Sequence, residues 1–96
     1  MSTVRIPPLL RAHVGGTKQV ELPAGTLGEV LDALASAYPV LRSLLFAEDG
    51  TLARGFRAFV DSRDARLTGG LSTPVEEHDL VVILPATGGG GGGGGA

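Results

Sequence analysis

An unbroken run of eight glycines, Gly88 to Gly95, fills most of the C-terminal end of this 96-residue chain. Glycine has no side chain to bury and loses more backbone entropy on ordering than any other residue, so the run cannot add to a core. The foldable part is therefore residues 1–86, and residues 87–96 form a glycine-rich tail that we expect to be flexible. Within residues 1–86, Val, Leu, Ile and Phe number 28, which is enough apolar material for one small domain.

The composition excludes several kinds of function. The chain has no cysteine, which removes disulfides, zinc–thiolate sites, iron–sulfur clusters and thiol nucleophiles. Its formal net charge is −2 and only 4% of its residues are aromatic, so we expect no nucleic-acid partner. No apolar run approaches the roughly 18 residues of a membrane span, and the first residues lack the pattern of a secretory signal. These absences predict a cytoplasmic protein without a membrane partner.

The clearest local signal is a helix over residues 26–38. Thr26 and Glu29 form a capping box, in which the hydroxyl accepts the third helical N–H and the carboxylate accepts the N–H of the cap. An apolar stripe at helical spacing follows, made of Leu27, Val30, Leu31, Leu34 and Tyr38. Pro39 ends the helix, because the residue before a proline resists the helical conformation.

Apolar runs on either side of this helix predict five strands, namely Thr3–Ala12, Lys18–Leu22, Phe56–Asp61, a weak strand near Ala65–Leu67, and Leu80–Leu84. Pro7-Pro8 demands a bulge or an edge position within the first strand. Gly15-Gly16 turns this strand into the second, and the two form a hairpin, whereas Gly69-Gly70 forms a later turn. We expect a short helical turn over Val40–Phe46. The last strand is almost continuously apolar, which favours a central strand covered on both faces.

This order of elements predicts an α+β fold with a mixed sheet packed on one main helix, which is the order of the β-grasp or ubiquitin-like fold. One domain then spans residues 1–86. The expected core contains Val4, Ile6, Leu27, Leu31, Leu34, Val60, Val82 and Leu84.

The tail suggests chemistry at the chain terminus. A terminal carboxylate is unreactive until ATP, supplied by another protein, converts it to an acyl-adenylate. A sulfur nucleophile can then displace AMP and leave a C-terminal thiocarboxylate. Glycine suits this task because a chain without Cβ atoms can thread a narrow channel in conformations that other residues avoid.

Four segments resemble one family, the cysteine-forming sulfur carriers of actinobacteria (the CysO type), within the wider set of ThiS- and MoaD-like β-grasp carriers. The segments are Ile6-Pro7-x-x-Leu10-Arg11-x-His13-x-Gly15-Gly16-x-Lys18-x-Val20, Thr26-Leu27-Gly28-x-Val30, Gly69-Gly70-Leu71-x-Thr73 and Ile83-Leu84-Pro85-Ala86. Each is weakly specific alone, but in this order and spacing they cover nearly all of residues 1–86.

The resemblance implies a protein co-substrate rather than an enzyme, without catalytic residues and without a bound cofactor. It implies an E1-like (ThiF/MoeB-type) adenylating enzyme that consumes ATP. It also implies a sulfur-accepting synthase, which in the CysO type forms cysteine, and a processing metalloprotease. The pathway served by this chain is not indicated by residues 1–86.

The tail departs from the family pattern. Members that resemble this chain end at a diglycine two or three residues beyond the Leu-Pro-Ala segment, which corresponds to Gly89 and Gly90, yet six more residues follow. Either a protease trims the tail to expose a glycine, or Ala96 itself is activated. We favour trimming, because a terminal methyl side chain would crowd a glycine-selective channel. If only Ala96 is removed, the reactive end lies at Gly94-Gly95.

Three arginines, Arg57, Arg63 and Arg66, cluster around the third and fourth predicted strands. We expect them on the sheet face opposite the helix. Arginine is enriched at protein interfaces, so Arg57 and Arg66 are candidates for partner docking. A role in solubility explains the same residues equally well.

The remaining polar residues predict no catalytic or metal site. His13 and His78 are far apart in the sequence, and each lacks the further ligands that a metal ion needs. Residues 76–79 are interpreted as a solvated turn before the last strand. The glycine run lacks the Lys-Ser/Thr pair and the following helix of a phosphate-binding loop.

Two other functions remain open alongside the general carrier. One is the small subunit of molybdopterin synthase, whose tail inserts permanently into a large catalytic subunit. The other is a ubiquitin-like modifier, whose C-terminus joins a lysine through an amide. A linker or low-complexity tail is the simplest alternative for the glycine run itself.

Overall fold

A computed structural model describes residues 1–86 of the chain. Its strands are β1 (Ser2–Arg5), β2 (Gln19–Leu22), β3 (Gly25–Thr26), β4 (Phe56–Val60), β5 (Arg63–Asp64), β6 (Pro74–Val75) and β7 (Leu80–Pro85). Its helices are α1 (Pro8–Arg11), α2 (Leu27–Ala37) and α3 (Val40–Leu45), with 3-10 turns η1 (Ala12–Val14), η2 (Ala65–Leu67) and η3 (Gly70–Ser72). The predicted reactive glycines Gly89, Gly90, Gly94 and Gly95 lie outside the described residues, as does Ala96.

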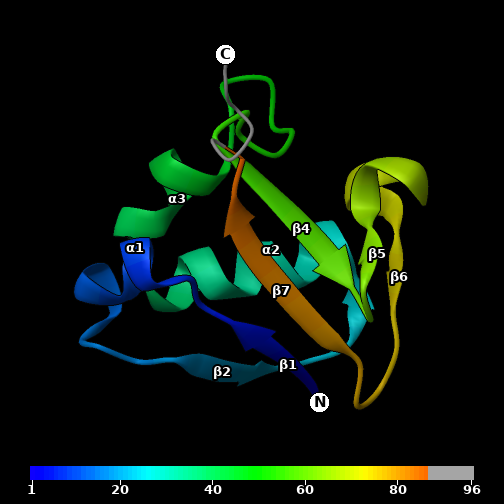
Figure 1. Ribbon diagram of the computed structural model, residues 1–96, viewed down its shortest axis with the longest axis horizontal. Coiled ribbons are helices and arrows are strands. Elements are labelled where there is room, and N and C mark those ends of the chain that lie inside the picture. Colours follow the sequence, from blue (N-terminus) through cyan, green and yellow to red (C-terminus); the bar gives the residue numbers. More distant parts are fainter. Residues whose placement is uncertain (87–96) are drawn as a thin grey trace.

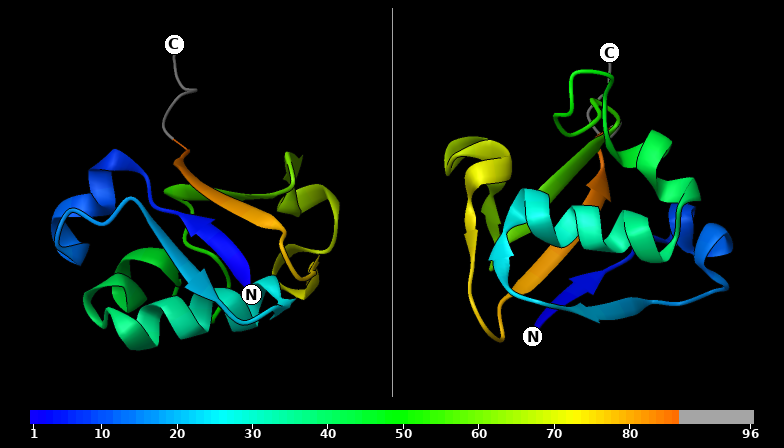
Figure 2. Two further views of the ribbon diagram at one scale, coloured as in Figure 1. Left: turned by 90° about the horizontal axis from the view of Figure 1, so that it is seen from below. Right: turned by 180° about the vertical axis from the view of Figure 1, so that it is seen from behind.

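A mixed five-stranded sheet forms the body, in the order β2-β1-β7-β4-β5, and β3 and β6 pair separately. The central strand β7 runs parallel to β1 and antiparallel to β4, and β1 pairs antiparallel with β2. Figure 1 looks onto one open face of the sheet, and Figure 2 shows α2 lying across the other face. This is the predicted β-grasp architecture, a mixed sheet packed on one main helix.

The main helix begins as the sequence predicts. The Glu29 N–H donates to Thr26 Oγ1 at 3.2 Å, and the Thr26 N–H donates to Glu29 Oε1 at 2.9 Å, so both halves of the capping box are formed. A Cβ atom at Gly25 would lie 2.5 Å from Glu29 Oε1, which explains the glycine before the cap. The helix ends before Pro39, and α3 is the predicted helical turn. Within residues 1–86, no helix combines the length and apolar character needed to cross a membrane.

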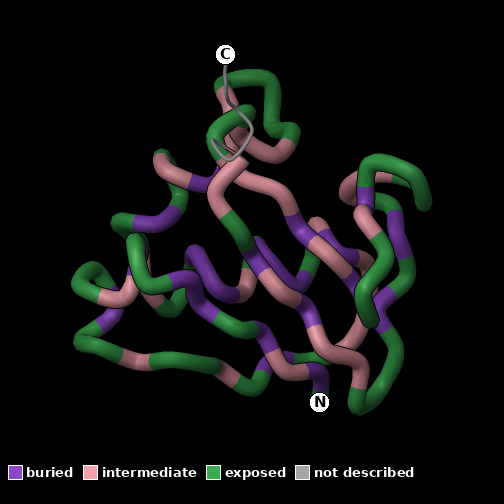
Figure 3. Tube along the Cα trace, viewed as in Figure 1, coloured by how far each residue is buried: buried purple, intermediate pink, exposed green. Residues whose placement is uncertain are grey.

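The core lies between α2 and the sheet (Figure 3). Its buried residues are Val4, Ile6, Leu10, Val14, Leu22, Leu27, Val30, Leu31, Leu34, Leu41, Leu45, Ala58, Val60, Ala65, Val75, Val81 and Ile83. The predictions for Val82 and Leu84 are wrong, because Val81 and Ile83 are fully buried while Leu84 is 42% exposed. Neighbouring residues of a strand point to opposite faces of the sheet. The sequence predicted that both faces of β7 are covered, but α2 covers only one of them.

The first predicted strand is less than half as long as expected. β1 ends at Arg5, and Pro8 begins α1 instead of forming a bulge. Proline fits the first position of a helix, since its missing N–H would be unpaired there anyway and its φ is already helical. The predicted Gly15-Gly16 turn is confirmed, with φ values of 66° and 81°. β1 and β2 are antiparallel as predicted, but α1 and η1 lie in the connection between them.

The fourth strand lies earlier in the chain than the sequence predicts. In the structure this strand is β5, and the predicted segment Ala65–Leu67 forms the 3-10 turn η2. Asp64 Oδ1 accepts the Arg66 N–H at 3.0 Å, which caps this turn and removes that N–H from strand pairing. The chain then turns at Gly69 and Gly70, both at positive φ, as the sequence predicts.

Candidate functional site

The root of the tail is a fixed point of the fold. At the end of β7, Pro85 pairs with Phe56 of β4, and the Ala86 N–H donates to the Gly55 carbonyl at 2.8 Å. Ala86 is the last described residue, and it lies beside the loop that leads into β4 (Figure 1). The central strand therefore delivers the tail at a defined position on the surface.

A cationic hollow of about 400 Å³ surrounds this root. Arg54, Arg57 and Arg66 line it together with Ala86, and its lining contains no acidic residue. The fold thus brings together the two predicted docking residues, Arg57 and Arg66. Sequence reasoning missed Arg54, whose only signal was its position three residues before Arg57 at the entry to a predicted strand.

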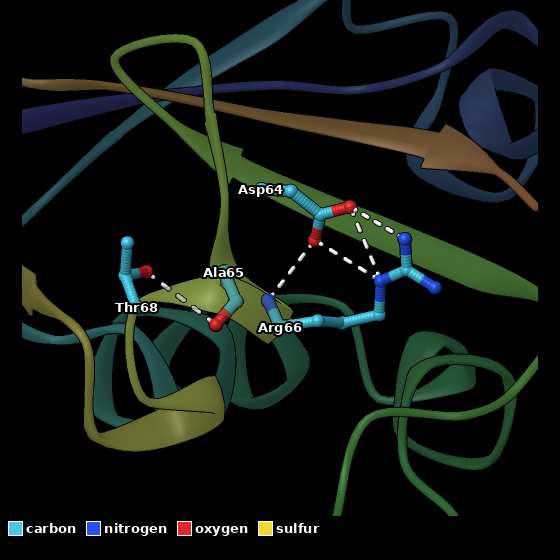
Figure 4. Close-up of polar contacts among 4 residues, drawn as sticks. All are labelled: Asp64, Ala65, Arg66 and Thr68. Atoms are coloured by element: carbon cyan, nitrogen blue, oxygen red, sulfur yellow. Dashed lines mark hydrogen bonds and ion pairs between the residues drawn. The ribbon is translucent and has the colours of Figure 1, made fainter.

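The Arg66 side chain is held by Asp64 (Figure 4). The Asp64 Oδ2 atom accepts from Arg66 Nη2 at 2.8 Å and from Nε at 3.1 Å. These bonds, and then the bond from the Arg66 backbone N–H, lower the pKa of Asp64 below its ordinary value, and the same pair raises the pKa of Arg66. Two donors to one carboxylate fix the plane of the guanidinium, which gives this charge a defined direction at the hollow.

The three predicted arginines do not share one sheet face. Arg57 alternates with the buried residues Ala58 and Val60, so it faces away from α2 as expected. Arg66 lies in η2, beyond the edge strand β5. Arg63 pairs with the inward-facing Val60 and lines a separate hollow of about 320 Å³. Arg57 and Arg66 meet at the tail root, and Arg63 does not join them.

An apolar surface occupies the sheet face opposite α2. We call it the sheet patch, and it consists of Phe59, Leu80, Val82 and Leu84, which line a hollow of about 270 Å³ with Ser62. Strand pairing sets Phe59 beside Val82 and Arg57 beside Leu84, so a cation flanks the patch toward the tail root. An open apolar patch with a charged rim is typical of a protein interaction site.

The acidic turn lies at the opposite end of β7 from the tail. Asp79 Oδ2 accepts the Glu76 N–H at 2.8 Å, which closes the turn before β7 as the sequence predicts. Asp61 accepts the Leu80 N–H at 2.9 Å; that bond, and then one shared with Asp79, lower the pKa of Asp61. The same shared bond raises the pKa of Asp79. The two carboxyl groups therefore shift each other's pKa in opposite directions at this end of β7.

The two histidines lie in different parts of the fold. His13 lies in η1 and His78 in the turn before β7, where its φ is 71°. Among residues 1–86, no three or more His, Cys, Asp or Glu side chains are arranged to hold a metal ion.

Comparisons with known proteins agree with this geometry. A sequence profile of the ThiS family matches residues 4–90. The sulfur carrier protein CysO of Mycobacterium tuberculosis (strain ATCC 25618 / H37Rv) is 40% identical over 86 residues, which cover 88% of this chain and 92% of that relative. The crystal structure of M. tuberculosis CysO aligns with a TM-score of 0.83 and 39% identity, covering 90% of this chain and 99% of the other. A chain in the crystal structure of the Amycolatopsis orientalis BexX/CysO complex aligns with a TM-score of 0.85 and 36% identity, covering 97% and 100%.

Proposed function

Because this chain belongs to the ThiS family, we propose that it carries sulfur as a thiocarboxylate on a glycine at its own C-terminal end. The chain is a ubiquitin-like sulfur carrier of the CysO type, a small carrier rather than a catalyst. The main support is positional: β7 ends at Pro85, the glycine run begins at Gly88, and the family match continues to Gly90.

The chemistry needs two displacements at the terminal carbonyl carbon. A carboxylate oxygen first attacks the α-phosphorus of ATP, the bond to the β-phosphate breaks, and pyrophosphate leaves. A sulfur nucleophile at the oxidation level of sulfide then attacks the acyl-adenylate, and AMP leaves as the C–S bond forms. An E1-like partner of the ThiF/MoeB type binds the ATP and orients the attack. This chain supplies the terminal carboxylate and a backbone free of Cβ atoms.

The reactive glycine is assigned by position in the sequence. The family match ends at Gly90, which supports Gly89-Gly90 as the equivalents of the family's terminal diglycine. A peptidase, in this proposal a metalloprotease, must then remove the residues beyond Gly90. If removal stops after Ala96, the reactive end is Gly94-Gly95. In either case the alanine methyl group must be removed before a glycine-selective channel can accept the terminus.

Three forms of the chain test this assignment, ending at Gly90, at Gly95 and at Ala96. Each is incubated with the cognate adenylating enzyme, ATP and sulfide, and its intact mass is measured. We expect the glycine-terminated forms to gain the mass difference between sulfur and oxygen, and the form ending at Ala96 to keep its mass. Thiocarboxylate on the alanine-terminated form would refute the requirement for trimming.

Partner docking in this proposal uses the face that adjoins the tail root. The sheet patch offers apolar area, and Arg57 and Arg66 offer charge beside it. A relative of the same type forms a complex in the A. orientalis BexX/CysO crystal structure, which supports docking of partner enzymes by this chain. The sulfur acceptor is a biosynthetic synthase, with the cysteine-forming type as the first candidate because the similarity is to CysO.

A further inference from the structure

A second hollow adjoins the cationic one at the tail root. Its volume is about 230 Å³, and it lies between the start of α2, η3 and the loop before β4. Its walls are mainly apolar and include Leu27 and Leu71. Leu52 and Arg66 line both hollows, so the two adjoin, and Ala86 lines the cationic one. We call the two hollows together the tail-root groove.

The walls of the apolar half are fixed by backbone contacts. A Cβ atom at Gly28 would lie 3.2 Å from Leu71 Cβ and 3.3 Å from the Leu71 carbonyl oxygen, so η3 packs closely on the first turn of α2. Leu52 is held by a backbone bridge to Phe46. Ala65 of the lining is buried at 3% exposure. The apolar half is therefore a preformed hollow with room for an aliphatic side chain.

The arginine charge of the cationic half is only partly neutralised by ion pairs within the described residues. Within residues 1–86, neither Arg54 nor Arg57 forms an ion pair, and Arg66 is bound to Asp64 through Nε and Nη2 only. Asp49 already accepts from the Thr51 hydroxyl at 2.6 Å, and Asp64 accepts from Arg66. These bonds, and in smaller part the charges of Arg54 and Arg57, lower the pKa values of the two carboxylates. Arginine donors pair best with carboxylate or phosphate oxygens. The groove is complementary to an anionic group next to an apolar one.

From this juxtaposition we propose that the tail-root groove binds an extended acidic segment of the partner that acts on the C-terminal end. One aliphatic side chain of the segment enters the apolar half, and carboxylates follow over Arg54, Arg57 and Arg66. The identity of that partner rests on the proposed function, while the chemistry of the segment rests on the groove. A purine in the apolar half would leave its polar ring atoms without partners, so a nucleotide fits the groove less well.

A peptide titration tests the proposal on the full chain by amide NMR. The probe is acetyl-Leu-Gly-Glu-Glu-Glu-amide, with one control peptide carrying Gly for Leu, a second carrying Lys for Glu, and ATP as a third ligand. We expect saturable shifts at Leu52, Leu71 and Ala86, binding about tenfold weaker without the leucine, and none with the lysine peptide. Absence of shifts at these amides, equal binding of the lysine peptide, or tighter binding of ATP would overturn the proposal.

Variants separate the groove from other cationic surface. Arg54→Ser combined with Arg57→Ser should abolish peptide binding, and Arg63→Ser, which removes an arginine outside the groove, should leave it unchanged. Sulfur loading is measured by intact mass on the same proteins. If the chain is loaded with sulfur but binds no peptide, the proposed groove is wrong and the proposed function stands. If the chain binds the peptide but is not loaded with sulfur at any chain length, the proposed function is wrong and the groove stands.

Discussion

The two faces of β7 carry the same types of apolar residue but differ in burial. Val81 and Ile83 point toward α2 and have no exposed surface, whereas Val82 and Leu84 point away from it. The covered face supplies the core, and the open face supplies the sheet patch. A continuous apolar strand in this molecule thus supports folding on one side, and its other side forms the patch that we propose for partner docking.

The difference arises from what covers each face. α2 presents Leu27, Leu31 and Leu34 to one face, and all three are fully buried. The other face has no covering element among residues 1–86, as the views in Figures 1 and 2 show. Apolar side chains left open in this way gain little from folding. Changes on the two faces should therefore separate stability from binding.

The largest expected effect is on the covered face. Ile83→Ala removes a fully buried side chain from the centre of the sheet, and we expect a loss of about 2–5 kcal/mol in the free energy of unfolding. The matched change Leu84→Ala on the open face should cost less than about 1 kcal/mol. Urea denaturation of both variants measures the difference. Equal losses would contradict the assignment of faces.

The next effect concerns the open face. Leu84→Asp places a charge in the sheet patch, and we expect association with the adenylating partner to weaken tenfold or more, about 1.4 kcal/mol, with little change in Tm. Titration calorimetry with the purified partner measures the affinity. Gln19→Asp, at the far edge of the sheet on β2, is the control and should bind normally. Normal binding by the Leu84 variant would remove the patch from the interface.

A smaller effect follows at the start of α2. Thr26→Ala removes the acceptor for the Glu29 N–H and should reduce stability by about 1 kcal/mol. Urea denaturation measures the loss. Ser43→Ala, on the exposed side of α3, is a control expected to have no effect. An unchanged free energy of unfolding in the Thr26 variant would contradict the role of the cap.

The smallest expected effect is a pH dependence of stability, which arises at the end of β7 opposite the tail. The bond shared with Asp61 raises the pKa of Asp79, so the stability from protonated Asp79 is lost as the pH rises through this folded-state value. Asp79→Asn keeps a donor toward Asp61 at every pH. The variant should have a higher Tm than the wild type at neutral pH.

This advantage should vanish as the pH falls below the ordinary aspartate value of 3.8, because Asp79 is then protonated in both folded and unfolded chains. Thermal unfolding across this range measures the difference. Glu48→Gln, in an exposed loop, controls for the loss of one acidic charge. A constant Tm difference at all pH values would contradict a raised pKa of Asp79.

Much of the fold could be predicted because its signals are local. Thr26 and Glu29 form a cap within four residues, and Pro39 ends the helix regardless of what surrounds it. Pro8 was ambiguous, because proline suits both a strand edge and the first turn of a helix. The inward residues of β7 could not be assigned, since five consecutive apolar residues show no alternation and only pairing with β4 fixes the face.

The candidate site was predictable only in part. The glycine run identifies the tail from composition alone, and Arg57 and Arg66 stand out by charge near predicted strands. Their meeting with Arg54 at Ala86 depends on the β4–β7 pairing, which joins residues about thirty positions apart. The apolar half of the groove depends on the packing of η3 against Gly28. No local sequence pattern predicts this contact.

Sulfur carriage on a terminal glycine is decided by the intact mass of the protein purified from its own host under conditions of active sulfur delivery. We expect a species that ends at a glycine of the run and exceeds its calculated mass by the replacement of one oxygen with sulfur. Fragmentation should place that sulfur on the terminal carbonyl. A protein that retains Ala96 and only oxygen at its terminus throughout working sulfur delivery would refute sulfur carriage on a trimmed glycine.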